Sequence, residues 1–331
     1  MARIVLGVAT SHSPLLTLEG DEWHNRAQAD LGNKKLTLAD GRIVDYDTLV
    51  VMRGAPYGDQ ATVENFQAQA ARCQAHLDRI AADIAEARPD VIVIVGDDQD
   101  ELYAPGNMPA IALFWGSEVV THSVDDDLPP WMQTVAAGYG MDETHIFPGH
   151  PSLALDIIKG MIAQEVDLAI ADTVPDPDNA GFGHAFGFPA ERLFGDLSIP
   201  MVPVLLNTYF PPNVMTPSRC HDVGAKLRHA IEASPLDLRV AILASGGLSH
   251  FVVEDAIDQQ VMDGLADPSG EALRNIPIEA LAEGTSEILN WILTAGAVSN
   301  LSLEWSEYEP IRRTPAGTGI GCGFAVWKPS G

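Results

Sequence analysis

The chain has few cysteines, little positive charge and no long apolar run. Its three cysteines, Cys73, Cys220 and Cys322, are odd in number and far apart, so they indicate neither a disulfide framework nor a zinc knuckle. No stretch approaches the ~20 apolar residues of a membrane span. The apolar run at the N-terminus is too short for a secretory leader, so we expect a cytoplasmic protein without a membrane partner.

Acidic residues far outnumber basic ones. The 331 residues include 46 Asp and Glu against 19 Lys and Arg, which gives a formal net charge of -27. Such a charge repels the phosphates of nucleic acids and anionic membrane surfaces. We therefore expect no nucleic-acid partner, and we interpret the acidic residues mainly as a solvated surface.

The hydrophobic content, 46%, is ample for a buried core. Short runs rich in Val and Ile recur along the chain, and runs of this kind are typical of strands covered on both faces of a sheet. The predicted strands are 4–8, 91–95, 110–114, 168–171, 202–206 and 240–243.

Helical patterns lie between these runs. Apolar residues step by three and four along 63–84, which predicts a long amphipathic helix. Further helices are predicted at 153–163, 221–232, 253–265 and 278–294. The alternation predicts an α/β fold, a single catalytic domain over 1–331 with a central, largely buried sheet flanked by helices. A long insertion after the first strand, about 16–60, is expected to act as a lid or dimer element.

Polar residues follow three of the predicted strands. His12 follows the first strand, the acidic run GDDQDE at 96–101 ends the second, and SGGLSH at 245–250 places His250 after a glycine turn. Open α/β folds build their sites at the carboxyl ends of strands. These residues are therefore the first candidates for chemistry.

An imidazole and a carboxylate on one face of Fe(II), with other positions open, form the kind of site that oxygen chemistry needs. His12 can supply the imidazole. Within the predicted helix 278–294, Glu283 and Glu287 can supply the carboxylate, and Glu287 lies one turn before Trp291 on an apolar face. Each glutamate is alternatively a surface residue.

Six segments of the chain form a recognisable set: the start of the chain through His12, the DDQ run at 97–99, Gly183-His184, NTYFPP at 207–212, SGGLSH at 245–250 and the spacing from Glu287 to Trp291. Together these segments resemble a known family, the class III extradiol ring-cleavage dioxygenases, which include the protocatechuate 4,5-dioxygenase catalytic subunit. The length and the insertion look closer to the 3-O-methylgallate 3,4-dioxygenase branch.

The resemblance implies a non-haem Fe(II) enzyme that opens a catechol-type aromatic acid such as 3-O-methylgallate, gallate or protocatechuate with O2. It implies that His12 and Glu287 bind Fe(II), that His250 is the acid/base catalyst and that His184 belongs to the catalytic pocket. It also implies a homodimer.

At the position of the family's second metal histidine this chain has Gln99. Gln99 can bind iron through its amide oxygen, a weaker ligand than imidazole. Alternatively Asp98 or a water fills the position, or the chain binds no metal and is a divergent binding protein. Two further alternatives are a different substrate such as a hydroxypyridone, and metal-dependent hydrolase or lyase chemistry.

The run RRTPAGTG at 312–319 places two guanidinium groups beside a glycine-rich loop. Arginine can donate two hydrogen bonds to one carboxylate. By resemblance, Arg312, Arg313, Thr318 and Ser13 are predicted substrate-binding residues; surface salt bridges are the alternative for the arginines. In the insertion, Trp23, His24 and Arg26 are further pocket candidates.

Overall fold

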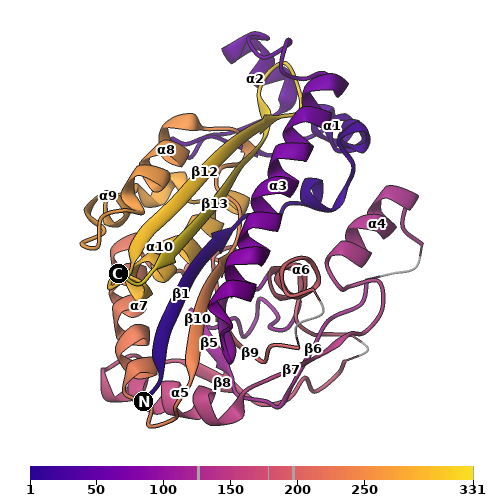
Figure 1. Ribbon diagram of the computed structural model, residues 1–331. Helices are drawn as coiled ribbons and strands as arrows, with labels where there is room; N and C mark the ends of the chain where they lie inside the picture. Colours follow the sequence, from indigo (N-terminus) through magenta and orange to yellow (C-terminus); the bar gives the residue numbers. More distant parts are fainter. Residues whose placement is uncertain (125–126, 178, 196–197, 331) are drawn as a thin grey trace.

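The computed structural model describes residues 1–124, 127–177, 179–195 and 198–330. Within them, nine strands form one mixed sheet in the order β11-β13-β1-β10-β4-β9-β5-β8, with β12 paired to β13 (Figure 1). The strands are β1 (Arg3–Thr10), β4 (Val91–Asp97), β5 (Ile111–Phe114), β8 (Ala169–Ala171), β9 (Met201–Leu206), β10 (Arg239–Ser245), β11 (His250–Val252), β12 (Ser302–Arg312) and β13 (Thr318–Lys328). This arrangement confirms the predicted α/β fold.

Helices cover both faces of the sheet (Figure 1). The α-helices are α1 (Trp23–Leu31), α2 (Tyr46–Arg53), α3 (Val63–Ala87), α4 (Pro130–Gly138), α5 (Pro151–Ala163), α6 (His184–Leu193), α7 (Pro217–Glu232), α8 (Asp255–Gly264), α9 (Glu271–Arg274) and α10 (Ile288–Ala297). Short 3-10 helices and two small two-stranded sheets complete the described secondary structure: η1 (Pro14–Thr17), η2 (Gly20–Glu22), η3 (Ile278–Ala280), η4 (Glu283–Glu287), β2 (Leu36–Thr37) with β3 (Ile43–Val44), and β6 (Glu118–Val120) with β7 (Ile146–Pro148).

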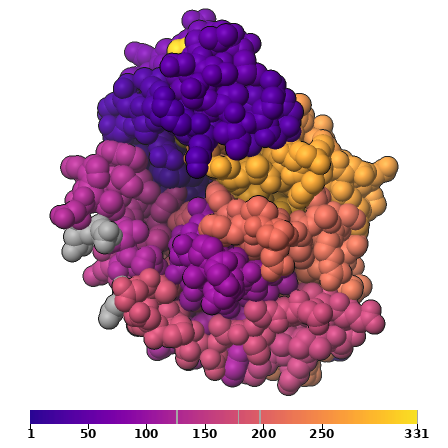
Figure 2. All heavy atoms as spheres, turned by 180° about the vertical axis from the view of Figure 1, so that it is seen from behind, coloured from indigo at the N-terminus to yellow at the C-terminus, as the bar shows by residue number. Residues whose placement is uncertain are grey.

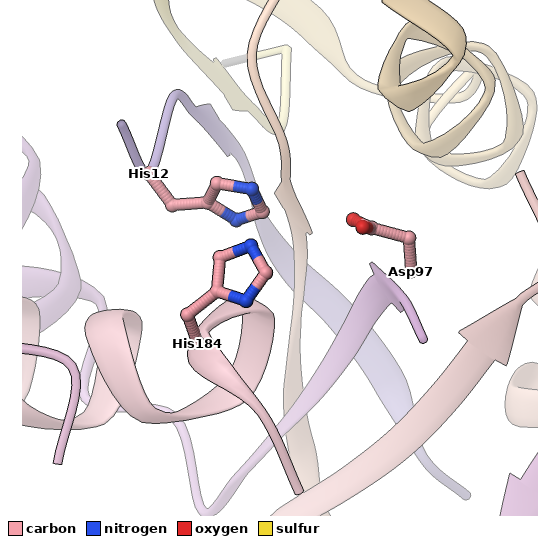
Figure 3. A group of neighbouring side chains, drawn as sticks. All are labelled: His12, Asp97 and His184. Atoms are coloured by element: carbon pink, nitrogen blue, oxygen red, sulfur yellow. The ribbon is translucent and has the colours of Figure 1, made fainter. Parts of the chain in front are cut away.

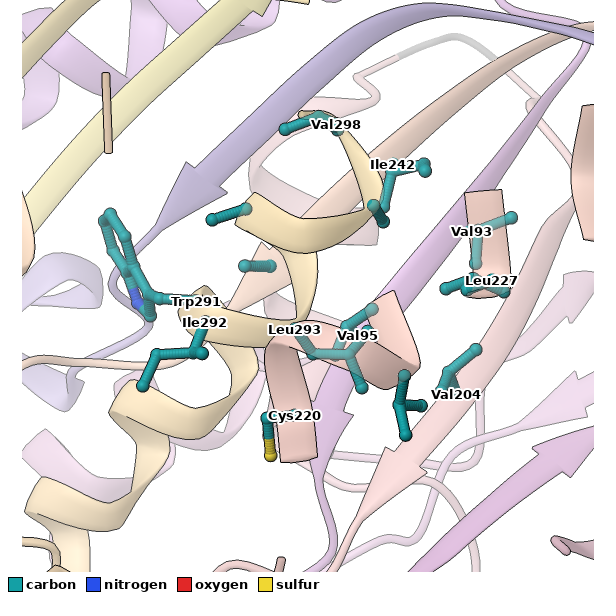
Figure 4. Packing of buried hydrophobic residues seen from close by; sticks show 14 of the residues in the cluster. Val93, Val95, Val204, Cys220, Leu227, Ile242, Trp291, Ile292, Leu293 and Val298 are labelled. Carbon is teal, nitrogen blue, oxygen red and sulfur yellow. The ribbon is translucent and has the colours of Figure 1, made fainter. Parts of the chain in front are cut away.

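The central strands are buried on both faces because their side chains alternate between two cores. On β4, Val93 and Val95 pack in the core that includes α5, α7 and α10, whereas Ile92 and Ile94 pack in the core that includes α3 and α6. Figure 4 shows the first core, where Leu293 of α10 lies among side chains of the sheet and α7. Burial on both faces explains why these runs are apolar throughout.

Four central strands run in parallel. β1, β10, β4 and β9 pair side by side in that orientation, so their carboxyl ends lie at the same edge of the sheet. His12 follows β1, Asp97 ends β4 and Gly246 follows β10. The topology thus gathers the polar groups predicted at strand ends.

Two sequence predictions need correction, and two strands were missed. The run 168–171 was expected to be a central strand, but β8 lies at the edge of the sheet and its Ile170 is 53% exposed. The expected continuous helix 278–294 is instead η3, η4 and α10. The long strands β12 and β13 were not anticipated.

The N-terminal insertion folds as η1, η2, α1, the β2-β3 pair and α2. Seen from behind, it forms one end of the molecule above a hollow in the surface (Figure 2). No helix of the described residues is sufficiently long and apolar to cross a bilayer.

Candidate metal and aromatic-substrate site

A buried group of imidazoles and carboxylates lies at the carboxyl edge of the parallel strands. Ligand atoms of His12, Asp97 and His184 lie within 4.8 Å of one another. Figure 3 shows the two imidazole rings side by side with the Asp97 carboxylate facing them. Glu287, at the junction of η4 and α10, belongs to the same group, since its Oε2 lies 3.1 Å from Nε2 of His12.

His12 is held by the sheet that precedes it. Its Nδ1 is 3.0 Å from Oγ of Ser245 at the end of β10, and the Tyr139 hydroxyl donates to its carbonyl at 2.6 Å. Nε2 is buried, has no hydrogen-bond partner among the described residues, and faces Glu287 without hydrogen-bonding geometry. A buried nitrogen of this kind is suited to a cation shared with the carboxylate.

Glu287 is ionised although it is buried. The Gly247 amide donates to its Oε2 at 2.6 Å and the Tyr209 hydroxyl donates to its Oε1 at 3.0 Å. Burial alone would raise the pKa of Glu287, but the nearby imidazoles of His250 and His12 and the Gly247 amide hold it well below its ordinary value. The site therefore keeps a carboxylate ready for a cation.

Asp97 is a second carboxylate in this group. Burial and the charge of Glu287 raise its pKa to about 6. The Asn290 amide donates to Oδ1 at 3.0 Å and the Gln99 amide donates to Oδ2 at 2.8 Å. The buried carboxylates of Asp97 and Glu287 repel each other unless protons or a cation lie between them.

His184, the first residue of α6, forms an ion pair with the half-buried Glu101. Its Nδ1 lies 2.8 Å from Oε1 of Glu101. Burial works against a charged ring, but Glu101 outweighs it and raises the pKa of His184 to about 9. Nε2 faces the Gln99 amide nitrogen at 3.3 Å.

His250 lies near the same carboxylate oxygen as His12, with its Nε2 3.9 Å from Oε2 of Glu287. Its Nδ1 is 2.9 Å from the Leu248 carbonyl, and because a carbonyl only accepts, Nδ1 carries the proton. Burial lowers the pKa of His250. The ring is therefore neutral with a basic Nε2, which is the state that a general base needs.

A cavity of about 410 Å³ opens onto these groups. Its lining includes His12, Ser13, Gln99, His184 and His250, together with Glu287. Aromatic and aliphatic side chains form much of the remaining wall: Val124, Leu128, Trp131, Met132, Val135, Tyr139, Met141, Tyr209, Phe251 and Ile320. A volume and lining of this kind suit a small aromatic molecule. A larger hollow, about 700 Å³, lies over residues 16–21 and α3 and contains none of these polar groups.

The predicted carboxylate-binding residues lie in different places. Arg313 lines the cavity, and its Nε donates to Asp30 at 2.8 Å. Thr318 donates to the same carboxylate and does not line the cavity. Arg312 lies outside the cavity, where it forms an ion pair with Asp255.

Arg26 of α1 is the second guanidinium of the cavity lining. Its guanidinium makes no hydrogen bond or ion pair with any other residue that the structure describes. Burial and the neighbouring charge of Arg313 lower the pKa of Arg26. Because Asp30 already neutralises Arg313, this end of the cavity has positive charge available for an anion.

Sequence reasoning missed several members of the site. Asp97 and Glu101 flank Gln99 in the acidic run, but neither was singled out. Tyr209 lies in the NTYFPP segment, which was noted only as one of the segments that carry the family resemblance. Asn290 and Tyr139 carried no pattern that indicates a site.

Comparisons with known proteins agree with this arrangement. The family model described as the catalytic LigB subunit of aromatic ring-opening dioxygenase matches residues 59–317. A gallate dioxygenase of Pseudomonas putida strain KT2440 is 31% identical over 164 residues, 46% of this chain and 46% of that protein.

Two further relatives are 2,3-dihydroxyphenylpropionate/2,3-dihydroxicinnamic acid 1,2-dioxygenases. The Mycobacterium ulcerans protein is 35% identical over 100 residues, 30% of this chain and 29% of that protein. The Mycolicibacterium paratuberculosis protein is 33% identical over 127 residues, 37% and 38% of the two chains. Each of these matches spans less than half of the relative's length. The family model, by contrast, covers most of the chain, which therefore belongs to the LigB family of catalytic subunits of aromatic ring-opening dioxygenases, within the class III extradiol superfamily.

Proposed function

We propose that the protein is a non-haem Fe(II)-dependent extradiol dioxygenase that opens the ring of a catechol-type aromatic acid with O2. The observation that carries this proposal is that His12, Glu287 and His184 line an aromatic-walled cavity and that the buried Asp97 lies beside His12 and His184. Family membership and the names of the relatives support the reaction class.

The residues present fit a divalent metal. The unpartnered Nε2 of His12 and the ionised Glu287 lie 3.1 Å apart and would both hold the ion. Imidazole and carboxylate are the ligand types of non-haem iron sites. When bound, Fe(II) supplies open coordination positions and the electron density that activates O2.

His250 would act as the base toward the substrate. His250 lines the cavity and its Nε2 lies 3.9 Å from Oε2 of Glu287, so a substrate hydroxyl bound beside Glu287 would lie within its reach. The proton taken at Nε2 can later be returned to the product. The Leu248 carbonyl stabilises the resulting imidazolium through Nδ1.

Arg26 and Arg313 would bind the carboxylate of the aromatic acid. Arg26 has no partner among the described residues, and both arginines line the cavity that holds His12 and Glu287. The aromatic wall would contact the ring between these two ends. We propose 3-O-methylgallate, gallate and protocatechuate as the substrates to test.

We propose that the insertion covers the cavity, because Arg26 of its helix α1 is part of the cavity lining. The single catalytic domain over 1–331, the homodimer and the cytoplasmic location remain predictions. So does the finer assignment to the 3-O-methylgallate branch. Size-exclusion chromatography with light scattering tests the homodimer.

The test of the reaction is oxygen uptake by Fe(II)-reconstituted protein given each of the three acids. We expect one substrate to be consumed with an equal amount of O2 and with loss of aromatic absorbance. Turnover without O2 uptake would contradict the proposal and favour metal-assisted hydrolysis or lyase chemistry. Iron-loaded protein that acts on none of the acids would refute the assigned substrate class.

A further inference from the structure

Gln99 stands where the family resemblance leads us to expect the second metal imidazole. In the structure its amide nitrogen, as the hydrogen-bond network assigns it, faces the acidic group. It lies 2.8 Å from Oδ2 of Asp97 and 3.4 Å from Oε1 of Glu287. Because the nitrogen faces the carboxylates, the amide oxygen is turned away from them and is not presented to a cation.

His184 presents an imidazole to the same point. Its Nε2 lies 3.3 Å from the Gln99 amide nitrogen, so that nitrogen sits between the ring and the two carboxylates. The ring centroids of His184 and His12 are 4.5 Å apart, and Figure 3 shows the two rings adjacent. A cation in this space would meet imidazole nitrogen from both rings.

Glu101 fixes the orientation of His184. Its Oε1 is 2.8 Å from Nδ1, and its Oε2 accepts the Gln99 backbone N–H at 3.2 Å. A carboxylate hydrogen-bonded to Nδ1 leaves Nε2 as the nitrogen available to a metal and makes Nε2 a stronger ligand. This arrangement is typical of metal-binding histidines.

We propose that His184 supplies the second imidazole of the metal site, alongside His12 and Glu287, and that Glu101 is its positioning residue. Gln99 then serves as a hydrogen-bond donor to the carboxylates instead of a ligand. This inference rests on the proposed function, because it presumes that the protein binds a divalent metal.

The test is anaerobic Fe(II) binding, measured by competition with a chelator, with the number of imidazole ligands counted by X-ray absorption. The variants are His184→Gln, Gln99→Ala, Glu101→Gln and the double variant Gln99→His/His184→Gln. His229→Gln, on the exposed face of α7, is the matched control. Circular dichroism and urea unfolding verify that each variant is folded.

We expect His184→Gln to weaken Fe(II) binding by more than ~100-fold and to remove one of the two imidazole ligands. Removing a residue that only hydrogen-bonds to a metal ligand already weakens metal binding by ~10–100-fold, and removing the ligand itself should cost more. Glu101→Gln should weaken binding by ~10–100-fold. Gln99→Ala should keep both imidazoles, and Gln99→His should restore much of the affinity lost in His184→Gln.

Two results would overturn the inference. One is that His184→Gln keeps wild-type affinity and both imidazoles. The other is that Gln99→Ala loses as much affinity as His184→Gln, which would make Gln99 the ligand. Failure of the wild-type protein to bind Fe(II) is distinguishable from both, since it would refute the proposed function itself.

Discussion

Arg26 offers the most discriminating test of how the cavity selects its ligand. Asp30 neutralises Arg313 through hydrogen bonds to both of its carboxylate oxygens, whereas Arg26 has no partner among the described residues. Replacing Arg26 by Met keeps much of the apolar stem and removes the charge. The variant therefore isolates the guanidinium's contribution to binding a carboxylate.

The size of the effect follows from the contact that is removed. A hydrogen bond to a charged group contributes ~1.5–3 kcal/mol, which corresponds to ~10–150-fold in the dissociation constant. Arg26→Met should weaken binding of the aromatic acid by this factor. It should leave binding of the corresponding methyl ester nearly unchanged, because the ester has no charge to lose.

The assay is anaerobic titration of the metal-loaded protein with an acid and with its methyl ester, so that no turnover occurs. Arg312→Met is the matched control, since Arg312 forms an ion pair with Asp255 and lies over the Tyr57 ring outside the cavity. Its acid and ester affinities should stay near wild type. Equal losses for acid and ester in Arg26→Met, or no loss for either, would refute the assigned contact.

Three other changes have expected outcomes. His250→Gln should lower kcat by ~10²–10⁴-fold with iron content unchanged. Because burial lowers the pKa of His250 below its ordinary 6.5, the base is neutral above that pH, and wild-type kcat should fall only below about pH 6.5. The variant should lose this fall in kcat at acid pH. A Cβ on Gly183 would clash with the Glu101 carboxyl, which orients His184. Gly183→Ala should therefore weaken Fe(II) binding by ~10–100-fold in a chelator titration. The control Gly106→Ala adds a Cβ in open space and should leave Fe(II) binding unchanged. Trp291→Phe removes the indole N–H that donates to the buried Gly246 carbonyl, so urea unfolding should show a loss of ~1–3 kcal/mol in the free energy of unfolding. An unchanged unfolding midpoint would contradict this.

The central sheet was predictable because its strands are buried on both faces. Apolar runs marked β1, β4, β9 and β10, and the residues after them marked the edge of the sheet where the site lies. Local sequence carries this signal because burial on both faces requires apolar residues throughout a strand.

β13 was missed because its glycines resemble a loop. A Cβ on Gly319 would clash with the Ile311 carbonyl of β12, and one on Gly323 would clash with the Trp291 ring. Glycine is required there by close packing between neighbouring segments, not by a turn. Only the tertiary structure distinguishes these two uses of glycine.

The partners of the site residues were also beyond local sequence. Glu287 was expected inside a continuous helix, but it lies at the end of η4, where the Gly247 amide and the Tyr209 hydroxyl donate to it. Glu101 becomes a candidate only once α6 brings His184 within 2.8 Å. Contacts between residues this far apart in sequence depend on the fold.

The most direct test of the central claim is the fate of the oxygen atoms. Fe(II)-loaded protein would be given 3-O-methylgallate, gallate or protocatechuate under ¹⁸O2, and the product would be analysed by mass spectrometry without delay. The account predicts a ring-opened product that contains both atoms of one O2 molecule. A product with oxygen from water alone, or with the aromatic ring intact, would contradict it.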